Sequence, residues 1–71
     1  MTDLETIKAM LDRQGLGYIE GPHEHGIGRV EGAVTDLGFN WKTEGFKGYS
    51  GFEATLVFDD TGAIVGVQAW E

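Results

Sequence analysis

Residues 51–70 constrain the fold of this chain more than any other segment. Two segments, GFEATLVF and AIVGVQAW, flank the tetrapeptide DDTG. The aspartates favour the start of a type I turn, and Gly62 suits the left-handed position that follows it. Alternating apolar side chains share one face: Phe52, Ala54, Leu56 and Phe58 on the first strand, and Val65, Val67 and Ala69 on the second. The segment therefore predicts an antiparallel hairpin.

The N-terminal residues have the pattern of an amphipathic helix. Thr2 precedes Glu5 by three positions, which is the spacing of a capping box. The apolar positions that follow lie on one helical stripe: Leu4, Ile7, Met10 and Leu11. Gly15 suits the left-handed residue that ends a helix. The sequence predicts a helix over residues 3–14.

Residues 18–42 carry β signals interrupted by turn residues. The segment YIE reads as a short strand that stops at Gly21-Pro22. The segment GRVEGAVT alternates, and DLG at 36–38 reads as a three-residue connection into FNWK. A hairpin with its turn at 36–38 is therefore predicted.

Together these elements predict one α+β domain over residues 1–71. Its helix, at about 3–14, would pack on a four- or five-stranded antiparallel β-meander within the β-rich region 18–71. The second face of the sheet would carry Val57, Ile64 and Trp70 beside Glu53. That is more apolar surface than a small monomer usually exposes, which indicates an interface.

Size and charge limit the kinds of partner. A domain of 71 residues buries only about 60% of the surface of its unfolded chain, and without cysteine no disulfide adds to its stability. Self-association as a homo-oligomer would add burial. The net charge of −7 disfavours direct binding to nucleic acid and favours a basic partner, although such a charge also serves solubility alone.

Two histidines form the one cluster with metal-ligand spacing. His23 and His25 flank Glu24, and in extended backbone they would point to the same side and chelate one ion. A third ligand is not identified, and two histidines in a loop flanked by glycine and proline are most often simply exposed. We expect no cofactor. No nucleophile motif or phosphate loop is recognisable, so we expect a protein that is not an enzyme.

The segment GFKGYSGF, residues 45–52, sets glycine before an aromatic ring three times. Flexible glycines with aromatic rings are typical of contact loops. The candidate partner-binding residues are Trp41, Glu44, Phe46, Tyr49, Glu53 and Trp70. In the alternative interpretation, Phe46 and Tyr49 fold back and seal one end of the core. Stacking of the rings on a nucleotide is a further alternative.

The segment GYSGFEATLVFDDTGAIVGVQAWE resembles the C-terminal hairpin of small uncharacterised phage and prophage proteins. The resemblance covers about a third of the chain. It implies a short acidic accessory protein that binds a host protein, often as an inhibitor of host or defence machinery. The chain shows no apolar run of membrane-spanning length and no signal-peptide pattern, so we expect it in the cytoplasm of the host cell. The alternatives are a small-ligand protein for a nucleotide or metal and a structural homo-oligomer.

Overall fold

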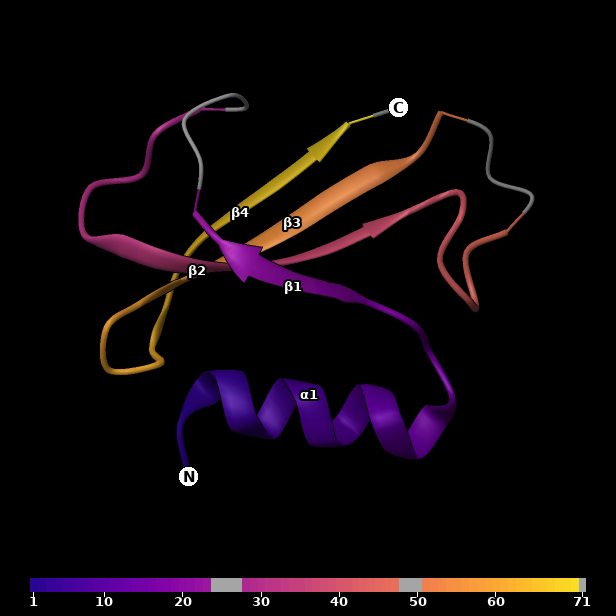
Figure 1. The fold of residues 1–71 in the computed structure, drawn as a ribbon, viewed down its shortest axis with the longest axis horizontal. Coiled ribbons are helices and arrows are strands. Elements are labelled where there is room, and N and C mark those ends of the chain that lie inside the picture. The colour runs from indigo at the N-terminus through magenta and orange to yellow at the C-terminus, as the bar shows by residue number, and fades with distance from the viewer. Residues whose placement is uncertain (24–27, 48–50, 71) are drawn as a thin grey trace.

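A computed structural model describes residues 1–23, 28–47 and 51–70. One helix, α1 (Asp3–Gln14), is followed by four strands: β1 (Ile19–Pro22), β2 (Ala33–Asn40), β3 (Glu53–Asp59) and β4 (Ile64–Trp70). The strands form one antiparallel sheet in the order β1-β2-β3-β4, and α1 lies along one side of it (Figure 1). The predicted α+β class is confirmed. Among the described residues, no helix is long and apolar enough to cross a membrane.

Both predicted ends of the helix are confirmed. The backbone N–H of Glu5 donates to Thr2 Oγ1 over 3.1 Å, and the backbone N–H of Thr2 donates to Glu5 Oε1 over 2.9 Å. These reciprocal bonds satisfy N–H groups that have no partner within a helix. The bond from the Thr2 backbone holds the pKa of Glu5 below its ordinary value. Gly15 follows the helix at φ 72°, in the left-handed region.

The start of α1 is bonded to the turn between β3 and β4. The N–H of Leu4 donates to the carbonyl oxygen of Gly62 over 3.0 Å, and the N–H of Ile64 donates to Asp3 Oδ2 over 3.0 Å. Gly62 has φ 85°, and a side chain there would collide with Thr2. The predicted turn glycine therefore also allows the helix to approach the hairpin closely.

The far half of α1 is bonded to β1 and the residue before it. Lys8 Nζ lies 2.6 Å from Glu20 Oε1, and the Tyr18 hydroxyl donates to Asp12 Oδ1 over 3.1 Å. The bond with Glu20 raises the pKa of Lys8. Burial, with a smaller contribution from Asp12, raises the pKa of Tyr18. Polar contacts thus position both ends of the helix on the sheet.

We call the sheet face that α1 covers the helix face, and the opposite one the open face. The buried core on the helix face consists of Leu11, Leu37, Phe39 and Phe58. Partly buried apolar side chains surround it: Leu4, Ile7, Leu16, Tyr18, Phe46, Phe52, Ala54 and Leu56. In the C-terminal hairpin, Val67 and Ala69 meet the β3 face as predicted, since Leu56 stands opposite Val67 and Ala54 opposite Ala69, whereas Val65 falls at a shift in the register. Alternation along β3 therefore predicted correctly which of its side chains lie on the helix face.

The predicted hairpin at 36–38 is wrong. Residues 36–38 lie inside β2, which begins only at Ala33, after Gly32 at φ 81°. Residues 28–32, predicted as part of a strand, lie outside the sheet. Leu37 is fully buried and Asp36 is bonded to His23, so the strand passes straight through the turn-like triplet DLG. Tertiary contacts override the local turn preference at this point.

The predicted apolar surface on the open face is also wrong. Val57 is fully buried there, because Val30 lies over the neighbouring Gly66. Ile64 stands opposite Phe58, a residue of the core on the helix face, because the register shifts at Val65. A bulge of this kind moves every following side chain relative to a regular strand. Val57 and Glu53 lie on the predicted face, although Val57 is not exposed, and the backbone of Trp70 stands opposite Glu53.

Leu37→Ala should destabilise the domain severely. Leu37 has no exposed surface, and a Leu→Ala change in a core costs about 2–5 kcal/mol through lost burial and the cavity left behind. For so small a domain that is most of the free energy of unfolding. Urea denaturation measures the loss, with Met10→Ala at an exposed helix position as the control. A Leu37→Ala midpoint close to that of the wild type would contradict this core assignment.

The β3–β4 turn should make stability depend on acid pH. Asp59 Oδ1 accepts bonds from the Thr61 hydroxyl, the Thr61 N–H and the Ala63 N–H at 2.6, 2.9 and 3.1 Å. These bonds, with that of the Thr61 side chain the largest, hold the pKa of Asp59 below its ordinary value. The contribution of the Asp59 carboxylate to the free energy of unfolding is therefore complete above the pKa that this group has in the unfolded chain. It is lost as pH falls through the lower pKa that the group has in the folded protein.

The gap in melting temperature between the wild type and Asp59→Asn should accordingly narrow from about pH 6 to about pH 3. Thermal unfolding followed by circular dichroism at several pH values measures this gap. Asp60→Asn, which removes the adjacent exposed carboxylate, is the control. A gap that widens in acid would show that Asp59 does not stabilise the turn as a carboxylate.

Candidate functional site: a groove on the open face

Three rows of residues cross the open face from strand to strand. They are Gly21–Asp36–Val57–Gly66, Ile19–Gly38–Thr55–Gln68 and Asn40–Glu53–Trp70. Antiparallel register places the members of a row side by side on one face. Whether another segment covers a row depends on where along the strands that row lies.

Residues 28–32, which we call the arch, cover the end of the first row that holds Val57 and Gly66. The Val30 methyls lie 3.5 and 3.7 Å from where a Gly66 side chain would begin, so this glycine leaves room for Val30 beside Val57. The Gln68 side chain donates to the Gly28 carbonyl over 3.3 Å. The arch thus passes over the open face and contacts β4. It covers the β3 surface that α1 cannot reach.

His23 bonds the arch to β2. Its Nδ1 lies 2.8 Å from Asp36 Oδ1, and its Nε2 accepts the Val30 backbone N–H over 3.2 Å. The side chain is only 5% exposed. These two bonds fit a neutral ring with its proton on Nδ1, since Nε2 acts as an acceptor. We therefore assign His23 a structural role in holding the arch.

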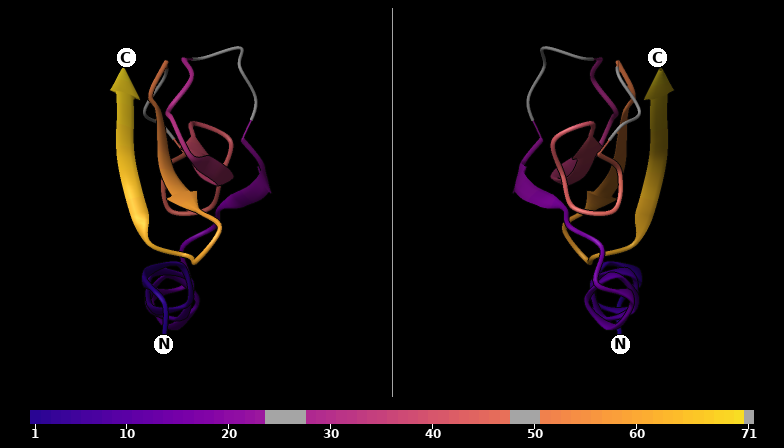
Figure 2. Two further views of the ribbon diagram at one scale, coloured as in Figure 1. Left: turned by 90° about the vertical axis from the view of Figure 1, so that its left-hand side faces the viewer. Right: turned by 90° about the vertical axis from the view of Figure 1, so that its right-hand side faces the viewer.

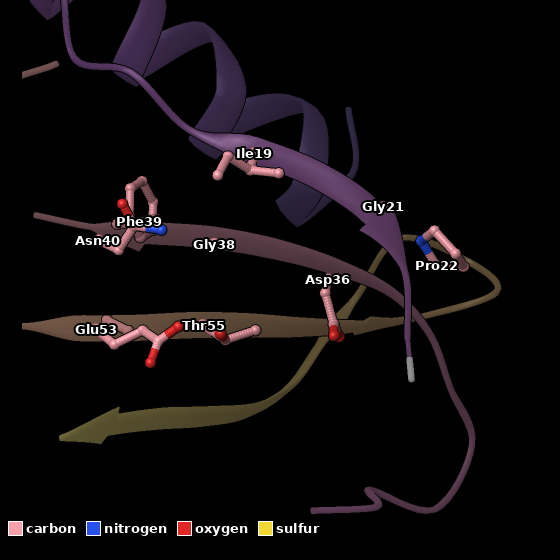
Figure 3. A pocket seen from close by; sticks show the side chains of 10 residues that line it. Ile19, Gly21, Pro22, Asp36, Gly38, Phe39, Asn40, Glu53 and Thr55 are labelled. Atoms are coloured by element: carbon pink, nitrogen blue, oxygen red, sulfur yellow. The ribbon is translucent and has the colours of Figure 1, made fainter. Parts of the chain in front are cut away.

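A groove of about 270 Å³ opens where the arch ends. Its lining comes from three strands: Ile19, Gly21 and Pro22 of β1, Asp36, Gly38, Phe39 and Asn40 of β2, and Glu53, Ala54 and Thr55 of β3. Figure 3 shows the bare backbone of Gly38 between the side chains of Ile19 and Thr55. The groove exists because the middle of this face has glycines where most strands carry side chains.

Carboxylates lie at two places along the groove. Asp36 lines it beside the arch, and Glu53 lines it at the start of β3. Asp36 is already bonded to His23. No cationic side chain among the described residues lies within ion-pair distance of Glu53. The groove therefore presents uncompensated negative charge, which favours a cationic group of a ligand or partner.

A rigid turn places Trp41 directly after the groove residue Asn40. The Asn40 side chain accepts the Lys42 N–H over 2.8 Å, and the Thr43 hydroxyl donates to the Asn40 carbonyl over 2.8 Å. Thr43 is buried, whereas Trp41 is 40% exposed, with Lys42 Nζ 5.8 Å from its ring. The turn thus presents an aromatic ring at low entropic cost, as binding surfaces do.

Among the described residues of the predicted contact loop, Gly45, Phe46 and Phe52 lie against the core. The Phe46 ring lies 5.3 Å from that of Phe39 and 5.6 Å from that of Phe52, centroid to centroid. Gly45, at φ 92°, lies against Leu16, where a side chain would collide. This placement of Phe46 fits the alternative interpretation, in which the ring seals one end of the core.

The remaining candidate residues have different positions. Glu44 is exposed, pairs with Lys47 over 3.0 Å and accepts the Gly17 N–H on its carbonyl over 2.8 Å. Trp70 ends β4, where its backbone stands opposite Glu53. Tyr49 and His25 lie outside the described residues. Of the predicted partner-binding set, the structure thus places Glu53 in the groove and Trp41 next to the groove residue Asn40.

The metal site stays a prediction. Within residues 1–23, 28–47 and 51–70, no three His, Asp or Glu side chains are grouped to hold an ion. Both ring nitrogens of His23 already have partners, so ligation through Nε2 would break the bond to Val30.

The chain was compared with protein-family models, with curated proteins and with solved structures. None of these comparisons gave a match. The function of the groove must therefore be argued from its own geometry and chemistry.

Of the residues that line the groove, sequence reasoning identified Glu53 alone; among those it missed are Gly21, Asp36 and Gly38. Gly38 was interpreted as a turn glycine. A signal for its true place was present, since Leu37 and Phe39 alternate with Asp36, Gly38 and Asn40 over one strand length.

His23→Ala should release the arch. Loss of the ring removes the acceptor of the Val30 N–H and leaves Asp36 without its donor, which costs about 1–3 kcal/mol for a buried bond. In His23→Ala, hydrogen exchange followed by NMR should be faster at the Val30 backbone amide. The change should be smaller in Asp36→Asn, because the side-chain oxygen of asparagine can still accept a hydrogen bond from His23. An unchanged Val30 exchange rate would contradict the assigned role.

Proposed function

We propose that this chain is a non-enzymatic accessory protein of phage or mobile-element type that binds a basic segment of a host protein in the cytoplasm. The observation that carries the proposal is the groove, in which the Glu53 carboxylate has no cationic partner among the described residues. A lysine or arginine side chain from a partner would supply that missing charge.

The groove suits the stem of such a side chain as well as its head. Ile19 is 57% exposed beside Gly38, so it offers apolar surface to the methylene groups of lysine or arginine. The charged head would then lie near Glu53. Because Gly38 has no side chain, the partner can approach the backbone of β2 closely.

Trp41 would enlarge this contact. Trp41 is exposed and follows the groove residue Asn40 in the chain, and tryptophan is among the residue types that dominate binding energy in protein interfaces; its ring face also attracts cations. Glu44 is held by Lys47 at the exposed surface, so we expect it to affect association rate more than affinity.

The net charge of the whole chain, −7, also supports a basic partner. Long-range attraction would steer a basic site toward the protein and would repel free nucleic acid. A host or defence protein with a basic nucleic-acid channel fits this chemistry. Occupation of that channel would make the protein an inhibitor.

The test is a panel of variants that change the groove without changing the fold. Gly38→Val fills its floor, because a side chain there would have only ordinary contacts, at 3.7 Å and beyond. Glu53→Gln removes the charge, and Trp41→Ala removes the ring. Glu31→Gln, an exposed carboxylate on the arch, is the matched control.

Tagged wild-type protein should retain a basic protein from a bacterial lysate, and calorimetry with that purified protein should give the affinities. Each groove variant should weaken binding by at least about tenfold, or 1.4 kcal/mol. The control should bind like the wild type. If Gly38→Val bound the partner with the same affinity as the wild type, the groove would be excluded as the binding site. A partner retained equally by all variants would overturn the proposal.

A further inference from the structure

The outer edge of β4 is unprotected. Within the part of the chain that the structure describes, β4 pairs only with β3, and Figure 2 shows no described segment beyond it. Within the described residues, one backbone group of this strand is bonded outside the β3–β4 pairing, the N–H of Ile64, which donates to Asp3. An edge strand presents a row of unpaired N–H and C=O groups that another strand can pair with.

The side chains of β4 also lack the usual protection of an edge. The strand reads IVGVQAW and contains no charged residue and no proline. Val67 is 65% exposed on the helix face, and Val65 is 41% exposed. The opposite edge, β1, is short, ends in Pro22 and carries Glu20 bonded to Lys8. Proteins block edges with these devices, and β4 has only its bulge.

From this contrast we infer that β4 pairs antiparallel with β4 of a second copy of the chain, about a two-fold axis at Val67. Val67 is the middle residue of Ile64–Trp70. The axis therefore sets Val67 against its own copy and Val65 of one chain against Ala69 of the other. The two sheets become continuous, with both helices on the same side.

Charge argues for a second copy and against a basic peptide on this edge. A basic strand would meet no carboxylate between Ile64 and Trp70, whereas a second β4 meets only neutral side chains. The acidic remainder of each copy, with a net charge of −7, repels the other at longer range. Salt screens that repulsion, so the dimer should tighten as salt rises, whereas binding of a basic peptide would weaken.

The pairing goes beyond the proposed binding role and does not depend on it. The groove is lined by β1, β2 and β3, so dimer formation through β4 leaves it open in each copy. Pairing also closes on itself, because the two-fold contact uses the β4 edge of both copies. The assembly should stop at a dimer.

Sedimentation equilibrium of the purified protein over a range of concentrations tests this inference. We expect a monomer–dimer equilibrium whose dissociation constant falls at least about threefold between about 0.02 M and about 0.5 M salt. Val67→Lys should weaken the dimer at least about tenfold, because it sets two like charges together at the axis. Met10→Lys makes the same change of charge at an exposed helix position and should dimerise like the wild type.

A charge-exchange experiment guards against simple misfolding of the variant. Val67→Glu alone should weaken the dimer as Val67→Lys does, and an equimolar mixture of Val67→Lys and Val67→Glu should form heterodimers, since opposite charges then meet at the axis. A chain that stays monomeric at all concentrations would overturn the inference. So would dimers that persist in Val67→Lys, assemblies larger than a dimer, or a mixture that remains monomeric.

Discussion

The structure depends on the burial of β3 from both sides. Val57 and Phe58 are neighbours in the chain, and neither has exposed surface. In a strand, neighbouring side chains point to opposite faces, so a single helix can cover only one of them. α1 covers Phe58, and the arch must cover Val57. A small domain cannot build a second helix layer, and a loop that crosses the sheet is the smallest available cover.

The groove exists because the arch covers only part of the open face. The arch is short, and it covers only the end of the open face that holds Val57 and Gly66. His23 fixes its position through Asp36, and the face beyond that pair is left uncovered. The same residue, Asp36, thus completes the support of the arch and lines the groove. Stability and the candidate site are coupled through one carboxylate.

The position of α1 affects the β4 edge of the sheet. Its first residues are bonded to the β3–β4 turn, and Lys8 and Asp12 farther along the helix are bonded to Glu20 of β1 and to Tyr18 before it. The helix therefore crosses the sheet from the β4 end toward β1 and leaves Val67 exposed on β4. Charge and proline protect the β1 edge, whereas β4 carries neither. The molecule therefore has two separate surfaces, an acidic groove and a neutral edge, which suit different kinds of partner.

Local patterns determined much of the fold. The capping box, Gly15 and the alternation around DDTG specified the helix and the C-terminal hairpin, because caps, turns and strand faces depend on residues close in sequence. The sequence also identified as candidate contacts Glu53, which lines the groove, and Trp41, which is exposed. Only tertiary structure decided that DLG continues a strand, that Val30 covers Val57, and that Gly38 opens a groove. Those outcomes depend on contacts between residues far apart in the chain, and one-residue shifts at Val34 and Val65 change the face of each side chain that follows.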